Sequence, residues 1–191
     1  MYVLVAGLVI FLGVHSVAIA APVWRQRMIG QIGALPWMAV YSVIAAAGLV
    51  LIIWGYGLAR QEPVPVYWPP TWLRHVALLL MIPVFPLLLA TYLPGRIRST
   101  ARHPMLVAVM LWAVAHLLAN GMLADILLFG GFLAWAAADR VSVGRRNAPP
   151  PPGMPPGTLN DAIAVVCGLT VYVAFILWLH VRLTGLPIVA L

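Results

Sequence analysis

The sequence predicts an all-α membrane protein with about six transmembrane helices, and two observations carry that prediction. Apolar residues make up 64% of the 191 residues and charged residues only 8%, which is far from the usual composition of a soluble globular domain. The apolar residues also form continuous runs of about 20, the length an α-helix needs to cross a bilayer. We therefore expect one polytopic helix bundle, a single domain over residues 1–191, embedded in the lipid bilayer.

The apolar runs divide the chain into six expected spans. The first ends in small residues, as a cleaved signal peptide does, but it lacks the positively charged start of such a peptide, so we expect it to remain as a span. Pro83 and Pro86 predict a kink in the third span. Asn120 and Gly121 predict a tight turn between the fourth and fifth. The expected spans are residues 2–21, 36–58, 72–92, 104–119, 122–141 and 160–182.

The arginines predict the orientation of the bundle. All eleven basic residues are Arg, and eight of them lie in alternate loops, which the positive-inside rule places in the cytoplasm, with both termini on the outer (periplasmic) side. The Pro-rich loop 145–157 falls on the cytoplasmic side and predicts an extended spacer. The arginines lie in short clusters between the apolar spans, where membrane proteins have their topology signals. We therefore expect no nucleic acid partner. The eight are Arg25, Arg27, Arg96, Arg98, Arg102, Arg140, Arg145 and Arg146.

Few chemical groups are available for catalysis or binding. The sequence has no Cys-x-x-Cys, Gly-rich phosphate loop, paired carboxylates or Ser-x-x-Lys, so metallohydrolases, nucleotide-binding proteins and proteases lack their motifs. Asp125 lies near the start of the fifth span, where a helix N-terminus favours a carboxylate. Asp139 is expected to pair with Arg140 at the end of that span. The remaining candidates are the five histidines.

Two histidines lie inside apolar spans. Ionisable groups in the hydrocarbon region usually face the protein interior and carry function, although His15 in the first span also fits a hydrogen-bonded structural role. His116 lies in the fourth span, with Trp112 one turn before it and Asn120 one turn after. Such a stripe is commonly a helix contact, but Asn120 is also placed to orient the imidazole.

The other three histidines are expected at the membrane interface. His103 precedes Pro104, as a residue at a helix start does. A helix turns about 100° per residue, so His103 and His116 would lie about 140° apart and would not easily face one ligand. His75 and His180 each lie close to an arginine at the end of a span.

Neutral imidazoles on two helices are the ligand set of a b-type haem, a cofactor that helix-bundle cores hold. We therefore expect His15 and His116 as axial ligands of haem b, with Asn120 and Trp112 supporting His116. At about 1.5 Å per residue, His15 lies about 9 Å from the cytoplasmic end of the first span. On the same scale, His116 lies about 18 Å from the cytoplasmic end of the fourth span, and His103 lies essentially at that end. Depth therefore does not choose between the last two, and His103 remains an alternative ligand. Histidines that only hold helices together, in a cofactor-free structural or assembly protein, are a further alternative.

Several longer motifs resemble the NnrU family of bacterial membrane proteins over most of residues 1–146. They are FLGVHS at 11–16, WGYGLAR at 54–60, PPTWLRH at 69–75, RHPMLVAVMLWAVAHLLANGMLAD from Arg102, and LLFGGFLAWAAADR at 127–140. The resemblance implies a multi-pass protein of the bacterial inner membrane that supports nitric oxide or nitrite metabolism in denitrification, with respiratory or denitrification membrane proteins as partners. The family's two intramembrane histidines fall on His15 and His116.

Two enzyme classes remain as alternatives. The NnrU family is related to 15-cis-zeta-carotene isomerase, a membrane enzyme with haem b held by histidines, which implies a haem-dependent cis-trans isomerase with a polyene substrate. The Arg-His-Pro motif also resembles the isoprenylcysteine-type methyltransferases. However, Leu106 stands where those enzymes have Tyr, and no Glu follows Glu62 to form their C-terminal Glu pair. The methyltransferase is therefore the last of the alternatives.

Overall fold

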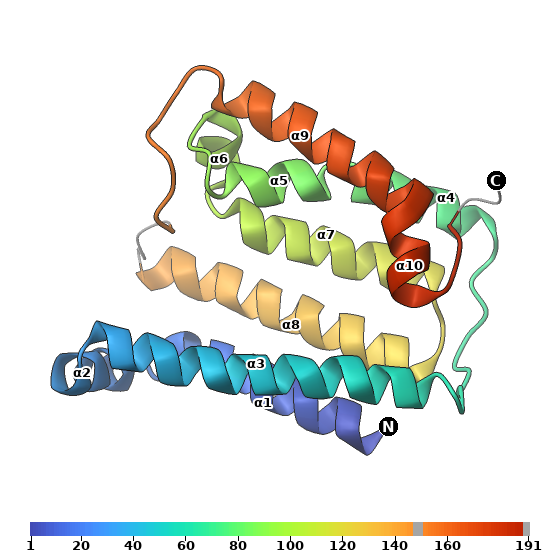
Figure 1. Ribbon diagram of the computed structural model, residues 1–191, viewed down its shortest axis with the longest axis horizontal. Helices are drawn as coiled ribbons and strands as arrows, with labels where there is room; N and C mark the ends of the chain where they lie inside the picture. Colours follow the sequence, from blue (N-terminus) through green and yellow to red (C-terminus); the bar gives the residue numbers. More distant parts are fainter. Residues whose placement is uncertain (147–150, 189–191) are drawn as a thin grey trace. The chain divides into compact units, whose positions relative to one another are not determined.

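The computed structural model describes residues 1–146 and 151–188 (Figure 1). Within these ranges the chain is helical, and its β-structure is limited to an isolated bridge between Pro65 and Met122. The chain divides into two compact units. The described residues of the first unit are 1–70 and 116–146, and those of the second are 71–115 and 151–188.

The helices divide between the two units, and one helix is shared by both. The first unit contains α1 (Tyr2–Ala20), α2 (Pro22–Ile32), α3 (Ala34–Ala59) and α8 (Leu123–Arg146). The second contains α4 (Trp72–Met81), α5 (Val84–Ala90), α6 (Arg96–Ala101), α9 (Asn160–Ala174), a π-helical segment (Phe175–Leu179) and α10 (His180–Thr184). Helix α7 (Pro104–Ala119) has its first twelve residues in the second unit and its last four in the first.

Within the described residues, five helical stretches are long and apolar enough to cross a membrane, which confirms the predicted class of a multi-pass, all-α membrane protein. They are residues 2–20, 34–59, 72–90, 123–146 and 160–184. The expected fourth span forms a helix with the predicted bounds, 104–119. Its 16 residues rise only about 24 Å, which is less than a typical hydrocarbon core of about 30 Å.

Proline sets two helix boundaries in the chain. The predicted kink in the third span is confirmed, because α4 ends at Met81 and α5 begins at Val84, directly after Pro83. The connection expected between the first two spans is instead the helix α2, which Pro22 begins at its first position. Gly33, with a φ of 90°, separates α2 from α3.

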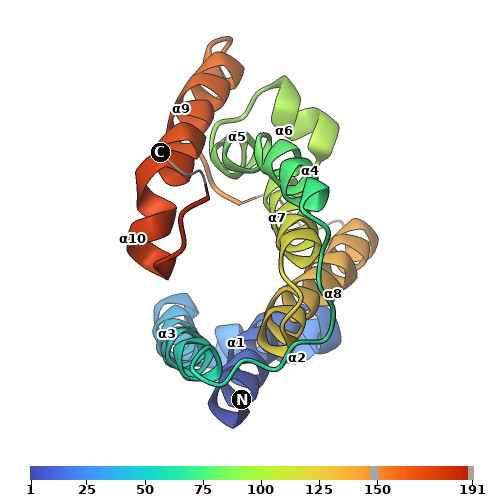
Figure 2. The same cartoon turned by 90° about the vertical axis from the view of Figure 1, so that its right-hand side faces the viewer.

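Helices α1 and α3 pack backbone against backbone, and they run side by side in both views (Figures 1 and 2). A Cβ atom added to Gly55 would lie 2.2 Å from the backbone nitrogen of Leu4, and one added to Gly48 would lie 2.7 Å from that of Phe11. A Cβ on Gly7 would lie 2.6 Å from the nitrogen of Ile52. The two helices are therefore antiparallel, and a glycine permits each of these contacts.

Helix α8 packs along α1 and is joined to α3 by a partly buried hydrogen bond. The rings of Phe11 and Phe132 are 5.6 Å apart. The Tyr56 hydroxyl donates to Oδ1 of Asp125 at 2.5 Å, and Asp125 is only 6% exposed. The other oxygen of Asp125 accepts from the backbone nitrogen of Met122 at 3.3 Å. The carboxylate thus lies at the helix N-terminus, as predicted, and also links two helices.

The ion pair of Asp139 differs from the prediction. Its Oδ1 pairs with Nη2 of Arg146 at 2.9 Å, and not with Arg140. Consecutive helix residues point about 100° apart, whereas residues seven positions apart lie on nearly the same face two turns on. The pairing with Arg140 was therefore wrong for a geometric reason.

The predicted turn at Asn120 and Gly121 is confirmed, and the loop after α3 holds it in place. The Tyr67 hydroxyl donates to the carbonyls of Leu117 and Asn120, at 2.8 Å from the latter. Partial burial, and then the charge of Asp125, raise the pKa of the Tyr67 hydroxyl above its ordinary value. A Cβ on Gly121 would overlap the carbonyl oxygen of Tyr67, which explains the glycine at this position.

In the second unit, α9 lies against α5 through another glycine. A Cβ on Gly168 would lie 2.4 Å from the nitrogen of Pro86. At the kink before Pro83, the backbone nitrogen of Ile82 donates to the carbonyl of Leu79. The carbonyl of Leu78 accepts a hydrogen bond from the Tyr172 hydroxyl at 2.7 Å instead. This arrangement fits the expectation that neighbouring helices satisfy the carbonyls freed by proline.

The predicted Pro-rich loop begins later than expected, because Arg145 and Arg146 belong to α8; over residues 151–157 it is exposed and anchored at several points. Residues 147–150 of the predicted loop lie outside the described residues. The nitrogen of Met154 donates to the carbonyl of Tyr92 at 2.8 Å, and Arg98 donates to the carbonyl of Pro151 at 2.8 Å. Asp161 then accepts from the backbone nitrogens of Arg96 and Ile97 at 2.7 and 3.0 Å.

The glycine contact between α1 and α3 is testable. Gly55→Ala is expected to lower the free energy of unfolding by about 1–3 kcal/mol, because the new methyl group requires the two helices to separate. Gly57→Ala is the matched control on the same helix, since a Cβ there meets nothing within 4 Å. Unfolding of the two variants in detergent measures the difference, and equal stability would argue against the close packing.

The contact of Asp161 with α6 is expected to stabilise the second unit. Asp161→Ala should cost about 1–2 kcal/mol, because it leaves two helix N–H groups without their acceptor. Glu62→Ala removes an exposed carboxylate of the first unit and serves as the control. The unfolding midpoint, together with the protease sensitivity of residues 151–159, measures the effect, and wild-type values for Asp161→Ala would contradict this role.

Candidate cofactor site around His15

The side chain of His15 lies among aromatic rings from three helices. It stacks on Phe11 of its own helix, with ring centroids 4.2 Å apart. The ring of Tyr41 on α3 meets it edge-on at 5.3 Å, and that of Trp135 on α8 does so at 5.7 Å. These contacts restrict rotation of the imidazole, so its nitrogens have defined directions.

A hydrogen bond within α1 selects the tautomer of His15. Its Nδ1 lies 2.6 Å from the carbonyl oxygen of Phe11, one turn earlier in the helix. A carbonyl oxygen only accepts hydrogen bonds, so Nδ1 carries the proton. In the neutral ring, Nε2 then keeps its lone pair. Histidines that bind metals commonly have this arrangement, in which the other nitrogen donates to a backbone carbonyl.

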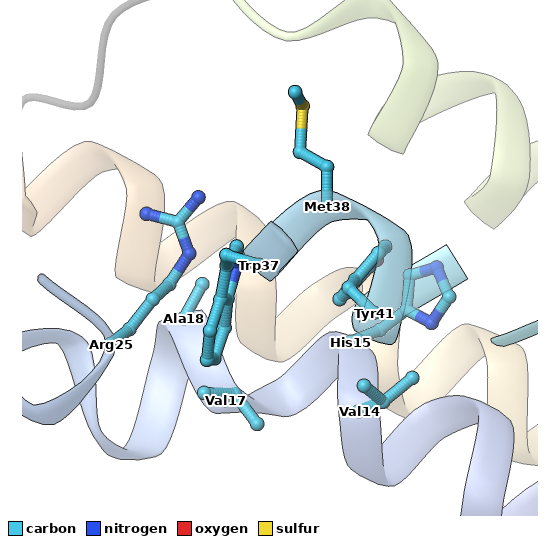
Figure 3. A pocket seen from close by; sticks show the side chains of 8 residues that line it. All are labelled: Val14, His15, Val17, Ala18, Arg25, Trp37, Met38 and Tyr41. Carbon is cyan, nitrogen blue, oxygen red and sulfur yellow. The ribbon is translucent and has the colours of Figure 1, made fainter. Parts of the chain in front are cut away.

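His15 lines a cavity of about 310 Å³ formed by α1, α2 and α3 (Figure 3). This volume is at the lower end of the range of small-molecule pockets, roughly 300–1,000 Å³. The wall is mostly apolar and carries a few polar groups, as ligand pockets do. The lining residues are Val14, His15, Val17, Ala18, Arg25, Trp37, Met38 and Tyr41.

The indole nitrogen of Trp135, beside His15, is a buried donor without an acceptor in the described part of the chain. Buried N–H groups are almost always hydrogen-bonded, and leaving one unpaired costs about 1–3 kcal/mol. Trp135 does not itself line the cavity, so this unpaired donor lies beside the ring of His15 and not on the cavity wall.

His116 contacts a different level of α8. Its ring stacks on Phe129, with centroids 4.4 Å apart. Phe129 precedes Trp135 by six residues, which is a rise of about 9 Å along the helix. The structure therefore places His15 at the cavity and His116 nearer the start of α8, and their joint ligation of one iron stays a prediction.

The remaining predicted residues lie on α7 or directly next to its ends. Asn120 donates through its side chain to the backbone carbonyl of His116 at 2.9 Å, a contact that caps the helix end. His103 directly precedes α7, whose first residue is Pro104, and this position confirms it as the residue at the helix start. Trp112 lies in the part of α7 that belongs to the second unit.

Sequence reasoning did not place four residues around His15. Trp37 and Tyr41 are four apart on α3 and therefore share a face, a signal that the sequence does contain. Arg25 was interpreted only as a topology signal. Trp135 had no local signal at all, because its position beside His15 depends on how α8 packs along α1.

The helices and the site together define a class: a multi-pass α-helical membrane protein with a histidine-lined cavity in its N-terminal unit. The chain matches the NnrU protein family over residues 3–188, and it belongs to that family. The match confirms the resemblance seen in the motifs and extends it over the Pro-rich loop and α9. Comparison with curated proteins and with solved structures gives no match.

Proposed function

We propose that this NnrU protein binds haem b with His15 as an axial ligand and supports nitric oxide or nitrite metabolism in the bacterial inner membrane. The observation that carries the proposal is the tautomer of His15: its Nδ1 donates to the carbonyl of Phe11 while the ring lines a cavity. The Nε2 lone pair is then available for iron, which a histidine engaged through both nitrogens would not offer.

The donor set around the cavity fits a haem. An imidazole ligand, apolar walls and aromatic rings that pack on a flat macrocycle are the chemistry of b-type sites. The unpaired N–H of Trp135 would find an acceptor on a bound group. His116 is proposed as the second axial ligand, with His103 as its alternative. When bound, a haem held by two histidines would supply one-electron transfer.

The protein's own residues prepare His15 for this task. The Phe11 carbonyl accepts a hydrogen bond from Nδ1–H of His15 and so makes Nε2 a stronger donor to a metal. Phe11, Tyr41 and Trp135 hold the ring plane. The apolar side chains of Val14, Val17 and other lining residues keep water from competing for the ligand position.

The physiological part of the proposal rests on the family. The likeness to NnrU proteins supports a role beside respiratory or denitrification membrane proteins, either in electron handling or in their assembly. The alternative, a haem-dependent isomerase of carotenoids, would use the same histidine and differs in its substrate. Product analysis after feeding cis-zeta-carotene separates the two, since only the isomerase changes the double-bond geometry.

Absorption spectroscopy tests haem binding by the full chain. Protein purified in detergent after expression with adequate haem is expected to show a Soret band that shifts on reduction. His15→Ala should abolish or shift the band, and His116→Ala should alter it, whereas His103→Ala and His180→Ala should leave it unchanged. The absence of a Soret band in the wild type would refute the proposal. A normal band in His15→Ala would refute the assigned ligand.

Trp135→Phe tests the unpaired indole. The variant keeps an aromatic ring but removes the N–H group, so the stability of the haem-free protein should change by less than about 1 kcal/mol, because no hydrogen bond is lost. Haem affinity, measured by titration, should fall about fivefold, since the bound group loses a donor. Trp54→Phe is the control for loss of an indole, because Trp54 lies exposed on α3 and does not line the cavity. Unchanged affinity in Trp135→Phe would show that the N–H group faces no ligand.

A further inference from the structure

The same cavity contains a guanidinium group that the haem ligand set does not use. Arg25 of α2 lines the cavity together with His15. Figure 3 shows the Arg25 side chain on one side of the Trp37 ring, with His15 and Tyr41 on the other side. Arg25 is half-buried, whereas Arg27, two residues further along α2, is exposed.

Arg25 forms no ion pair with a carboxylate of the described chain. The salt bridge that the structure shows among residues 1–146 and 151–188 joins Arg146 to Asp139, and no carboxylate lies within ion-pair distance of Arg25. A half-buried cation against an apolar wall is costly unless an anion neutralises it. The group that occupies the cavity should therefore carry a negative charge at the Arg25 side.

We propose that Arg25 binds a carboxylate of the ligand that His15 coordinates, namely one propionate of haem b; this inference rests on the haem site proposed above. A guanidinium pairs with a carboxylate through two parallel hydrogen bonds, which fixes orientation as well as adding affinity. Trp37, between Arg25 and His15, offers its ring to the macrocycle. A porphyrin with acidic side chains carries a partner for each of the three residues: a metal for His15, a flat apolar ring for Trp37 and a carboxylate for Arg25.

An anionic lipid is the competing occupant, and the cavity favours the porphyrin over it. A lipid phosphate would neutralise Arg25 but would leave the lone pair of His15 and the N–H of Trp135 unused. The porphyrin uses the metal-binding nitrogen of His15 and the cation of Arg25 at the same time. Arg25 is therefore proposed as a positioning residue, which sets the rotation of the macrocycle about the bond between iron and His15.

Titration of the haem-free full chain with haem and with haem dimethyl ester tests this inference, because the ester lacks both carboxylates. The wild type is expected to bind haem at least tenfold more tightly than the ester. Arg25→Gln should lose about tenfold in haem affinity and bind the two compounds equally, with an unchanged Soret maximum because His15 still ligates. Arg25→Lys should recover part of the preference, and Arg27→Gln should behave as the wild type.

The outcomes distinguish this inference from the proposed function. If the wild type gives a Soret band but binds haem and its ester equally, Arg25 does not bind a propionate, although the proposed haem site is retained. This comparison uses the wild type alone, so it does not depend on whether a variant folds. If Arg25→Gln keeps full haem affinity but loses binding of phosphatidylglycerol vesicles, Arg25 serves a lipid and the inference is wrong. If neither compound gives a Soret band, the proposed function fails, and the inference fails with it.

Discussion

The close approach of α1 and α3 at Gly7, Gly48 and Gly55 is the contact on which the first unit depends. In a bilayer, burying apolar side chains between helices gains little, because lipid tails are equally apolar, so helices associate where small residues let their backbones approach. Each of these glycines faces backbone atoms of the other helix. A shift in register would place a larger side chain at a contact that admits none, and the alignment is therefore unique.

That alignment creates the surroundings of His15. It places Tyr41 of α3 beside the imidazole, while α8, packed along α1, adds Trp135. The hydrogen bond from Tyr56 to Asp125 ties α3 to α8 nearer the start of α8. The ring of His15 is thus held by neighbours on α1, α3 and α8, and a ligand in the cavity would meet a fixed imidazole. Such preorganisation is what a site for a coordinated cofactor requires.

Local sequence signals predicted much of the helical framework and failed where pairing is distant. Pro83 and the Asn120-Gly121 pair marked real boundaries, because proline and turn residues act on their own neighbours. The partners of Tyr56 and Tyr172 lie 69 and 94 residues away, and no periodicity indicates such pairs. The wrong partner for Asp139 has the opposite cause: adjacency in sequence was preferred over the direction in which helix residues point.

The sequence by itself determined the class of protein, the approximate spans, the family and the presence of an imidazole within the first span. These follow from composition, run length and local motifs, none of which needs a partner helix. Only the tertiary structure decided which rings surround His15, that Trp135 has an unpaired donor there, and that Arg25 shares the cavity. The reason is that these side chains come from three other helices, whose placement against α1 depends on the packing of one helix on another.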